Sequence, residues 1–153
     1  MATANTAAIS TVNQRVSDLG EYTTVASVAV YFRDGSYRLD KTGKATLDQF
    51  VATTASLNGY VIEVAGHTDS AGSVHFNQTL SDRRAATVAQ YLRENDSVPA
   101  WRIATPAGYG ETRPAIENTD SKARAMNRRV EVKILVSKGL LQSAPLASGA
   151  LNQ

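Results

Sequence analysis

The chain has 153 residues, of which 42% are hydrophobic, so it is long and apolar enough for one domain with a buried core. Its 16 basic and 14 acidic residues are scattered and give a net charge of +2. That pattern argues against a nucleic-acid partner, because nucleic-acid binders concentrate Lys and Arg on one face. The sequence contains no cysteine, which excludes disulfides, thiol catalysis and cysteine-based metal sites.

Residues 1–24 carry a short apolar stripe at helical spacing, formed by Ile9, Val12, Val16 and Leu19. A stripe of two to three turns is marginal on its own. We therefore expect a helical linker or spacer, with a weak homo-oligomer formed through residues 1–24 as the alternative.

The N-terminus carries no evident targeting signal. The first ten residues lack the basic region and the apolar region of a secretion signal. No apolar run in the chain is long enough to span a bilayer. From these features alone, the protein is either cytoplasmic or trimmed of a leader.

The next segment predicts a strand, a helix and a second strand. Residues 25–33 are β-branched and apolar, as expected of a buried strand. Asp40 can cap a helix that runs to about Leu57, where Asn58-Gly59 provides a stop signal. Residues 60–65 predict the second strand, followed by a polar loop.

The second half of the domain predicts a long helix over about 77–94, with Asn77 or Thr79 as its cap. A short strand near 103–107, a short helix at 121–126 and a clearly alternating strand at 129–136 follow.

The predicted order is β-α-β-α-β-(α)-β, which indicates an α/β fold, a sandwich of a sheet with helices packed on it. We place the domain at residues 25–137 and expect residues 138–153 to be a flexible tail.

Helical phase separates two adjacent arginines in the long helix. With Val88 at the centre of the buried face, Arg84 falls about 40° from the centre and Arg83 about 140° away. Arg83 should therefore face solvent, whereas Arg84 should lie in the apolar stripe. A guanidinium left unpaired there would cost several kcal/mol, so Arg84 needs a partner.

The best candidate partner of Arg84 is Asp69, in the polar loop that follows the second strand. One interpretation is a structural salt bridge between the two side chains. The other is that a ligand separates them, with Asp69 binding an ammonium and Arg84 binding a carboxylate. The two groups together fit the head of an amino acid, and the residues alone leave both interpretations open.

Other chemistry has weaker support in the sequence. His67 and His75 do not match a zinc-binding spacing. The serines lack the G-x-S-x-G pattern of a hydrolase nucleophile. Gly66 and Gly72 permit a positive φ, so the loop that they bound could cradle a carboxylate. We therefore expect no metal, no cofactor and no catalytic residues.

The motifs in this region resemble the OmpA C-terminal-like domain, which also occurs in peptidoglycan-associated lipoprotein and in the flagellar stator protein MotB. The resemblance covers roughly residues 25–136. It is carried by Gly66-His67-Thr68-Asp69, Gly72, Asn77, Leu80-Ser81, Arg84-Ala85, Val88, Gly108-Tyr109-Gly110-Glu111, Pro114 and Asn127-Arg128-Arg129-Val130-Glu131-Val132.

The resemblance implies a mixed four-stranded sheet and a non-enzymatic module that binds peptidoglycan non-covalently. The expected ligand is the meso-diaminopimelate of the stem peptide. Asp69 would bind its side-chain ammonium and Arg84 its carboxylate, and Thr68 and Asn77 would add hydrogen bonds. Structural or supporting roles fall to Arg128, whose strand parity points it toward the core, and to Gly72 and Leu80.

The resemblance also implies a periplasmic protein that anchors an outer-membrane or envelope partner to the cell wall, with residues 1–24 as a spacer. The chain departs from relatives at Arg33-Asp34-Gly35-Ser36, where Gly35 removes a side chain from a segment that often borders the pocket. The alternative is a protein-docking or oligomerisation module that uses the N-terminal helix, with Asp69 and Arg84 in a purely structural salt bridge.

Overall fold

The computed structural model describes residues 21–137. The predicted apolar stripe at residues 9–19 and the predicted tail at 138–153 lie outside this described part, as does the proposed oligomer contact through the stripe. The first strand starts at Tyr22, three residues earlier than predicted.

The described residues form strands (β), α-helices (α) and short 3₁₀ helices (η). In chain order they are β1 (Tyr22–Tyr31), α2 (Lys41–Ala52), η1 (Thr53–Ser56), β2 (Tyr60–Gly66), α3 (Val74–Glu94), η2 (Ala100–Arg102), β3 (Ala107–Gly108), α4 (Ser121–Asn127) and β4 (Arg129–Ser137).

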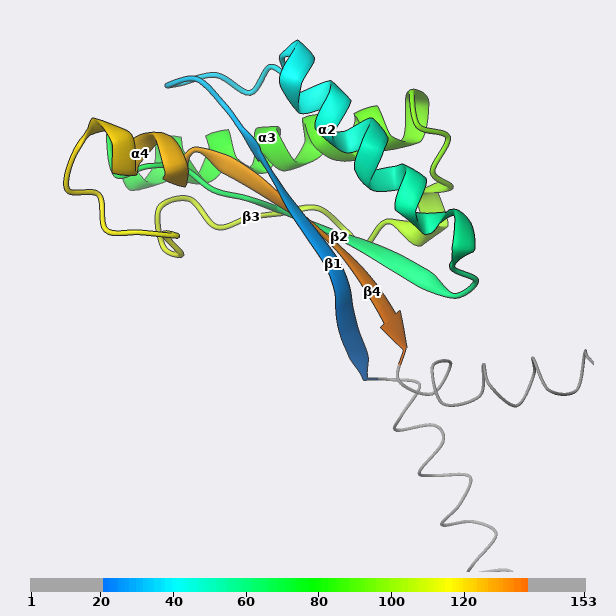
Figure 1. Cartoon of the computed structure of the whole chain (residues 1–153). Coiled ribbons are helices and arrows are strands. Elements are labelled where there is room, and N and C mark those ends of the chain that lie inside the picture. The colour runs from blue at the N-terminus through cyan, green and yellow to red at the C-terminus, as the bar shows by residue number, and fades with distance from the viewer. Residues whose placement is uncertain (1–20, 138–153) are drawn as a thin grey trace, which may run out of the picture.

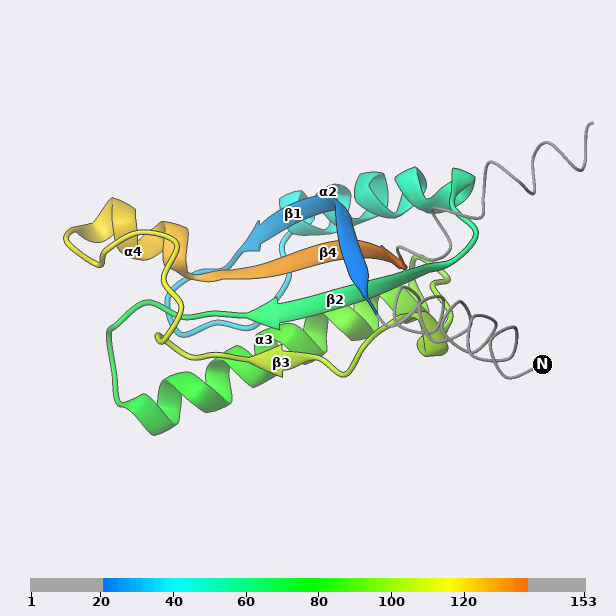
Figure 2. The same cartoon turned by 90° about the horizontal axis from the view of Figure 1, so that it is seen from below.

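The four strands form one mixed sheet in the order β1-β4-β2-β3. β4 pairs antiparallel with β1 and with β2, whereas β2 pairs parallel with β3. Helices α2 and α3 lie on one side of this sheet (Figures 1 and 2). The predicted α/β fold with a mixed four-stranded sheet is confirmed.

The core lies between the sheet and these two helices. β4 alternates as predicted: Val130, Val132, Ile134 and Val136 are buried. Burying an aliphatic side chain of this size stabilises the fold by about 1.5–3 kcal/mol. These side chains pack against Leu47 and Phe50 of α2 and against Val88 and Leu92 of α3, and all of them belong to one apolar cluster.

Two predicted helix boundaries differ from the structure. Asp40 caps α2 as expected, accepting a hydrogen bond from the Gly43 N–H at 2.8 Å, but the α-helix ends at Ala52 and continues only as η1. α3 begins at Val74 with Ser73 as its cap, so Asn77 and Thr79 do not cap it.

The predicted strand at 103–107 is also shorter than expected. Only Ala107–Gly108 pairs as a strand, and Ile103 forms a single isolated bridge with Ile62.

Helix α3 approaches the sheet very closely at Gly66 and Gly108. A Cβ at Gly66 would collide with the backbone of Ser81, and one at Gly108 would collide with Asp82. Gly66 is therefore needed for close approach and does not use a positive φ, whereas Gly72 does adopt one, at 89°. The Ser81 hydroxyl also accepts a hydrogen bond from the Gly110 N–H at 2.9 Å, which fixes the loop after β3 to α3.

Candidate ligand-binding site

The polar loop after β2 holds Asp69 in a fixed position. Asp69 is only 5% exposed, and its Oδ1 accepts a hydrogen bond from the Ala71 N–H at 3.0 Å. Two neighbours bind its backbone carbonyl: the Thr68 hydroxyl donates at 2.9 Å and the Asn77 amide at 3.3 Å. Thr68 and Asn77 therefore position the loop that carries the carboxylate.

Arg84 projects from α3 into the core and is 0% exposed. Its guanidinium donates to three backbone carbonyls: Nε to Ser36 at 2.7 Å, Nη1 to His67 at 2.9 Å and Nη2 to Arg33 at 3.0 Å. The Arg84 guanidinium thus joins α3 to the loop after β1 and to the loop after β2. The predicted difference between a buried Arg84 and an exposed Arg83 is confirmed.

Burial lowers the pKa of Arg84 to about 10, while the nearby Asp69 carboxylate acts in the opposite direction. At neutral pH the side chain stays protonated, because this pKa is still well above 7. The ring of Phe32 lies 5.3 Å from the Arg84 guanidinium carbon and covers one side of the charge.

Asp69 and Arg84 do not form the direct salt bridge that one interpretation of the sequence required. Asp69 instead pairs with Arg128, with 3.3 Å between Oδ2 and Nη1. Three backbone carbonyls, rather than the Asp69 carboxylate, accept hydrogen bonds from the Arg84 guanidinium. The two residues still belong to one unit, because the His67 carbonyl that binds Arg84 lies two residues before Asp69.

Arg128 does not point into the core as its strand parity suggested. It follows α4 directly and precedes β4, so the alternation of the strand does not apply to it. Its side chain is 20% exposed and donates from Nε to the Phe32 carbonyl at 3.0 Å. Arg128 is therefore a partly accessible cation bound to Asp69.

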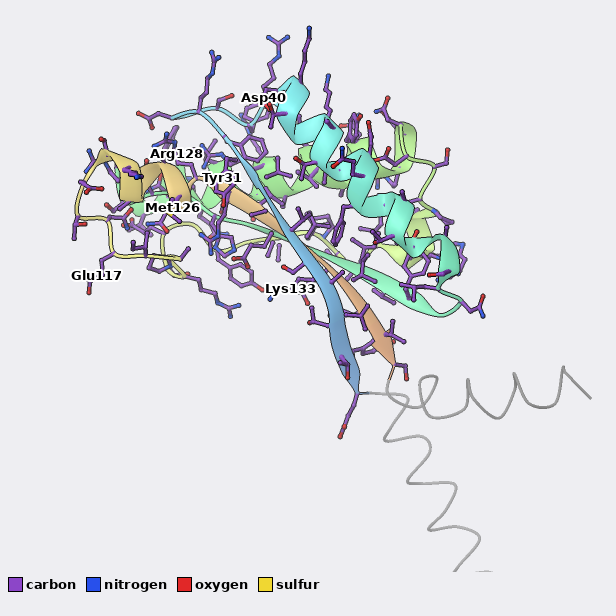
Figure 3. The ribbon with its side chains drawn as sticks, viewed as in Figure 1. Tyr31, Asp40, Glu117, Met126, Arg128 and Lys133 are labelled. Carbon is purple, nitrogen blue, oxygen red and sulfur yellow. The ribbon has the colours of Figure 1, made fainter. Side chains whose placement is uncertain are left out.

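A cavity of about 370 Å³ lies next to Arg128. It is bounded by the end of β1 and the loop that follows, and by α4, with Tyr31, Asp40 and Met126 among its lining residues (Figure 3). Arg128 and Phe32, which also line it, contact Asp69 and Arg84 respectively. The predicted binding residues Asp69, Arg84, Thr68 and Asn77 do not line this cavity.

Asn127 shapes the far side of the site, a role that the sequence motif alone did not assign to it. It is fully buried, and its Oδ1 accepts from the Ala115 N–H at 2.8 Å while its Nδ2 donates to the Ile116 carbonyl at 2.7 Å. These bonds fix the loop before α4. They leave the next residue, Arg128, at a defined place beside Asp69.

The two histidines differ in their surroundings. His75 is exposed at the start of α3. His67 is 3% exposed, and its ring stacks on that of Tyr109 with 5.6 Å between centroids. Burial, reinforced by Arg129, lowers the pKa of His67 to about 4, so its imidazole is neutral at physiological pH. Among residues 21–137, no group of three or more His, Asp and Glu side chains could hold a metal ion.

No helix within residues 21–137 is long and apolar enough to cross a membrane. Leu80 is buried one turn before Arg84, and Gly72 lies against Phe76, so both help to shape the start of α3.

Comparison with known proteins gives a consistent result. The sequence model of the OmpA family matches residues 31–128. Outer membrane porin F of Pseudomonas fluorescens is 47% identical over 88 residues, which are 58% of this chain and 26% of that protein. The chain therefore spans about a quarter of the length of this curated relative.

Two solved structures are similar in fold and sequence. The peptidoglycan-associated lipoprotein from Burkholderia pseudomallei has a TM-score of 0.64 and 26% identity, over 69% of this chain and 88% of that one. The cell wall anchor of the T6SS from Pseudomonas aeruginosa has a TM-score of 0.61 and 25% identity, over 72% of this chain and 80% of that one.

Proposed function

Since the chain belongs to the OmpA family, we propose that it binds peptidoglycan without catalysing a reaction and anchors an envelope protein to the cell wall. Two structurally similar proteins carry such a role in their names, a peptidoglycan-associated lipoprotein and a cell wall anchor. Peptidoglycan lies outside the cytoplasmic membrane, so the domain would act in the periplasm. The described domain, residues 21–137, would be the binding module.

The ligand that suits the site best is the meso-diaminopimelate of the stem peptide. Its free stereocentre carries an ammonium and a carboxylate, and the site holds a buried carboxylate and a buried guanidinium in one unit. This juxtaposition of Asp69 and Arg84 across the His67 carbonyl is the observation that carries the proposal. Asp69 would bind the ammonium and Arg84 the carboxylate, with Thr68 and Asn77 as further hydrogen-bonding residues.

Arg84 retains donor capacity for such a carboxylate. A guanidinium has five N–H groups, and the three bonds to Ser36, His67 and Arg33 use one on each nitrogen. One N–H remains on each terminal nitrogen, and these are the donors that would bind the carboxylate of the ligand. Because Arg84 is fully buried, the ligand would reach it only after a local movement of the residues that cover it.

The anchoring proposal is tested by retention on purified sacculi. Asp69→Asn keeps the size of the side chain and removes its charge, so we expect retention at least about tenfold lower than that of the wild type. Arg83→Gln, an exposed change beside Arg84, is the matched control and should bind as the wild type does. Circular dichroism confirms that each variant is folded. Equal retention of Asp69→Asn and wild type would contradict the site assignment.

A second comparison tests the identity of the ligand. Soluble stem peptides with diaminopimelate are compared with peptides that carry lysine, which keeps the ammonium and lacks the carboxylate. We expect the lysine peptide to bind about tenfold or more weakly, because Arg84 then gains no partner. Equal affinity for both peptides would reject the diaminopimelate assignment while leaving peptidoglycan binding intact.

A further inference from the structure

Within residues 21–137, the outer edge of β1 is unpaired, and the segment Ala26–Tyr31 carries neither a charge, a proline nor a bulge. β1 is the first strand in the order β1-β4-β2-β3, so within residues 21–137 it pairs on one side only. Its ten residues, YTTVASVAVY, include no charged residue and no proline. Proteins usually protect such edges with Lys, Pro or very short strands, because unpaired backbone groups are a template for another strand.

The direction of the backbone groups follows from the pairing with β4. The Phe32 N–H donates to the carbonyl of Arg128, its direct partner in the continued register, at 2.9 Å. In an antiparallel ladder, successive residues point their N–H and C=O groups to opposite sides of the strand. The backbone N–H and C=O groups of Val28 and Val30 therefore point toward β4, whereas those of Ser27, Ala29 and Tyr31 point toward the open edge.

The part of β1 suited to pairing is the segment Ala26–Tyr31. The register shifts between Thr24 and Ala26, as in a β-bulge. Figure 2 shows the two halves of the strand running in different directions at this bend. Beyond the bend, Ala26–Tyr31 pairs without interruption with Arg129–Ile134. The three residues whose backbone groups point to the open edge thus lie in a segment of regular pairing.

We propose that this edge pairs antiparallel with the same edge of a second copy of the chain, about a two-fold axis at Ala29. In this register Tyr31, which is 51% exposed, lies beside the partner's Ser27, a small residue that leaves room for the ring. The absence of charge in the strand removes the repulsion that two identical charged strands would meet. A mixed eight-stranded sheet results.

The geometry favours a closed pair over a longer assembly. The opposite edge of the sheet is β3, with only two residues, Ala107–Gly108, so it offers little to a third copy. A contact that uses the same surface on both partners closes on itself, whereas an edge-to-edge contact of two different strands would grow.

Sedimentation velocity of the full chain over a concentration series tests the proposal. We expect the mass to double as concentration rises. Ala29→Pro removes an outward N–H and leaves the bonds to β4 in place, and Ala29→Lys puts two like charges at the axis. Both should weaken association at least about tenfold. Thr24→Lys adds the same charge outside the paired segment and should associate as the wild type does.

A single cysteine tests the register independently of the stability of these variants. The natural chain has no cysteine, so Ala29→Cys places its only thiol at the two-fold axis. Cα atoms of such a pair lie about 5.5 Å apart, within the range of a disulfide. We expect oxidised Ala29→Cys to form a covalent dimer and Thr24→Cys to remain largely uncrosslinked. A wild type that stays monomeric at all concentrations, or equal crosslinking of both variants, would overturn the proposal.

Discussion

Arg84 keeps its charge inside the core because backbone carbonyls, rather than a carboxylate, surround its guanidinium. The phase of α3 was sufficient to predict that Arg84 is buried and Arg83 is exposed. Its partners could not be predicted, because the carbonyls of Arg33 and Ser36 belong to a loop about fifty residues away and any residue type supplies a carbonyl. The sequence did single out Arg128, but not its contact with Asp69, which spans 59 residues.

Arg84→Lys should therefore be strongly destabilising although it preserves the charge. A lysine ammonium cannot reproduce the planar geometry that serves three carbonyls at once. We expect a loss of about 3–5 kcal/mol in the free energy of unfolding, the range seen when a buried charge loses its partners. Urea denaturation measures the difference, and Arg83→Lys should lie within about 0.5 kcal/mol of the wild type. A similar small loss for Arg84→Lys would show that the three bonds contribute little.

His67 should make the protein less stable as the pH falls. Its pKa is about 4 in the folded protein, against a value of 6.5 for an unperturbed histidine. Between these values the unfolded chain binds a proton that the folded protein does not, so stability is lost as the pH falls from about 6.5 to 4. Burial lowers this pKa most, and Arg129, Arg113 and Lys133 lower it further, whereas Glu131 acts in the opposite direction.

His67→Phe tests this dependence, because phenylalanine fills similar space and does not titrate. Thermal unfolding at pH 7 and at pH 5 should show a smaller decrease in Tm for His67→Phe than for the wild type. His75→Gln, at an exposed position, should keep the wild-type decrease. An identical decrease in all three proteins would mean that other groups control the acid sensitivity.

At the scale of elements, regular patterns were predictable and irregular junctions were not. β4 alternates from Val130 to Val136, so the burial of its apolar residues follows from the sequence, whereas the burial of Arg129 and Ser137 at its ends does not. The start of α3 was misplaced because Ser73 and Asn77 are both good caps, and only the structure shows that the Asn77 amide is used by the Asp69 carbonyl. β3 was overestimated because its pairing depends on how closely β2 and α3 approach, which sequence periodicity does not encode.

Asp96 lies beside Asp48 of α2, and its contribution to stability should change with pH in the opposite direction from that of His67. The Tyr91 hydroxyl donates to Asp48 Oδ1 at 3.0 Å, connecting α3 to α2. Burial, together with a hydrogen bond to Asp48, raises the pKa of Asp96 to about 7. The folded protein therefore holds a proton that the unfolded chain releases near pH 4, so this contribution to stability is lost as the pH rises from about 4 to 7.

Asp96→Asn should remove that loss, because an amide donates to Asp48 without needing a proton. We expect the Tm of Asp96→Asn, relative to that of the wild type, to increase as the pH rises from 5 to 8. Glu117→Gln, which removes an exposed carboxylate (Figure 3), should show no such gain. If Asp96→Asn and wild type shift in parallel, Asp96 does not carry a shared proton at pH 5.

At the scale of the whole molecule, the topology separates the two ends of the described chain from the candidate site. Tyr22 pairs with Ser137, so both ends of the described chain lie at one end of the sheet (Figure 1). Gly66, which leads into the Asp69 loop, pairs with Val130 near the other end of β4. Seven residues of strand separate these points, a length of about 23 Å. A domain tethered by its ends would therefore present the site away from its tether.

Pairing through β1 would give each assembly two such sites, and a polymeric ligand would then bind more tightly than a soluble fragment. A second binding event within one assembly gains from a high effective concentration, without any new contact. We expect the wild type to be retained on sacculi at least about tenfold better than Ala29→Pro. Both proteins should bind a soluble stem peptide with the same affinity, because Ala29 lies outside the site. Weaker binding of the soluble peptide by Ala29→Pro would show damage to the site itself, and equal retention on sacculi would show that pairing does not contribute to anchoring.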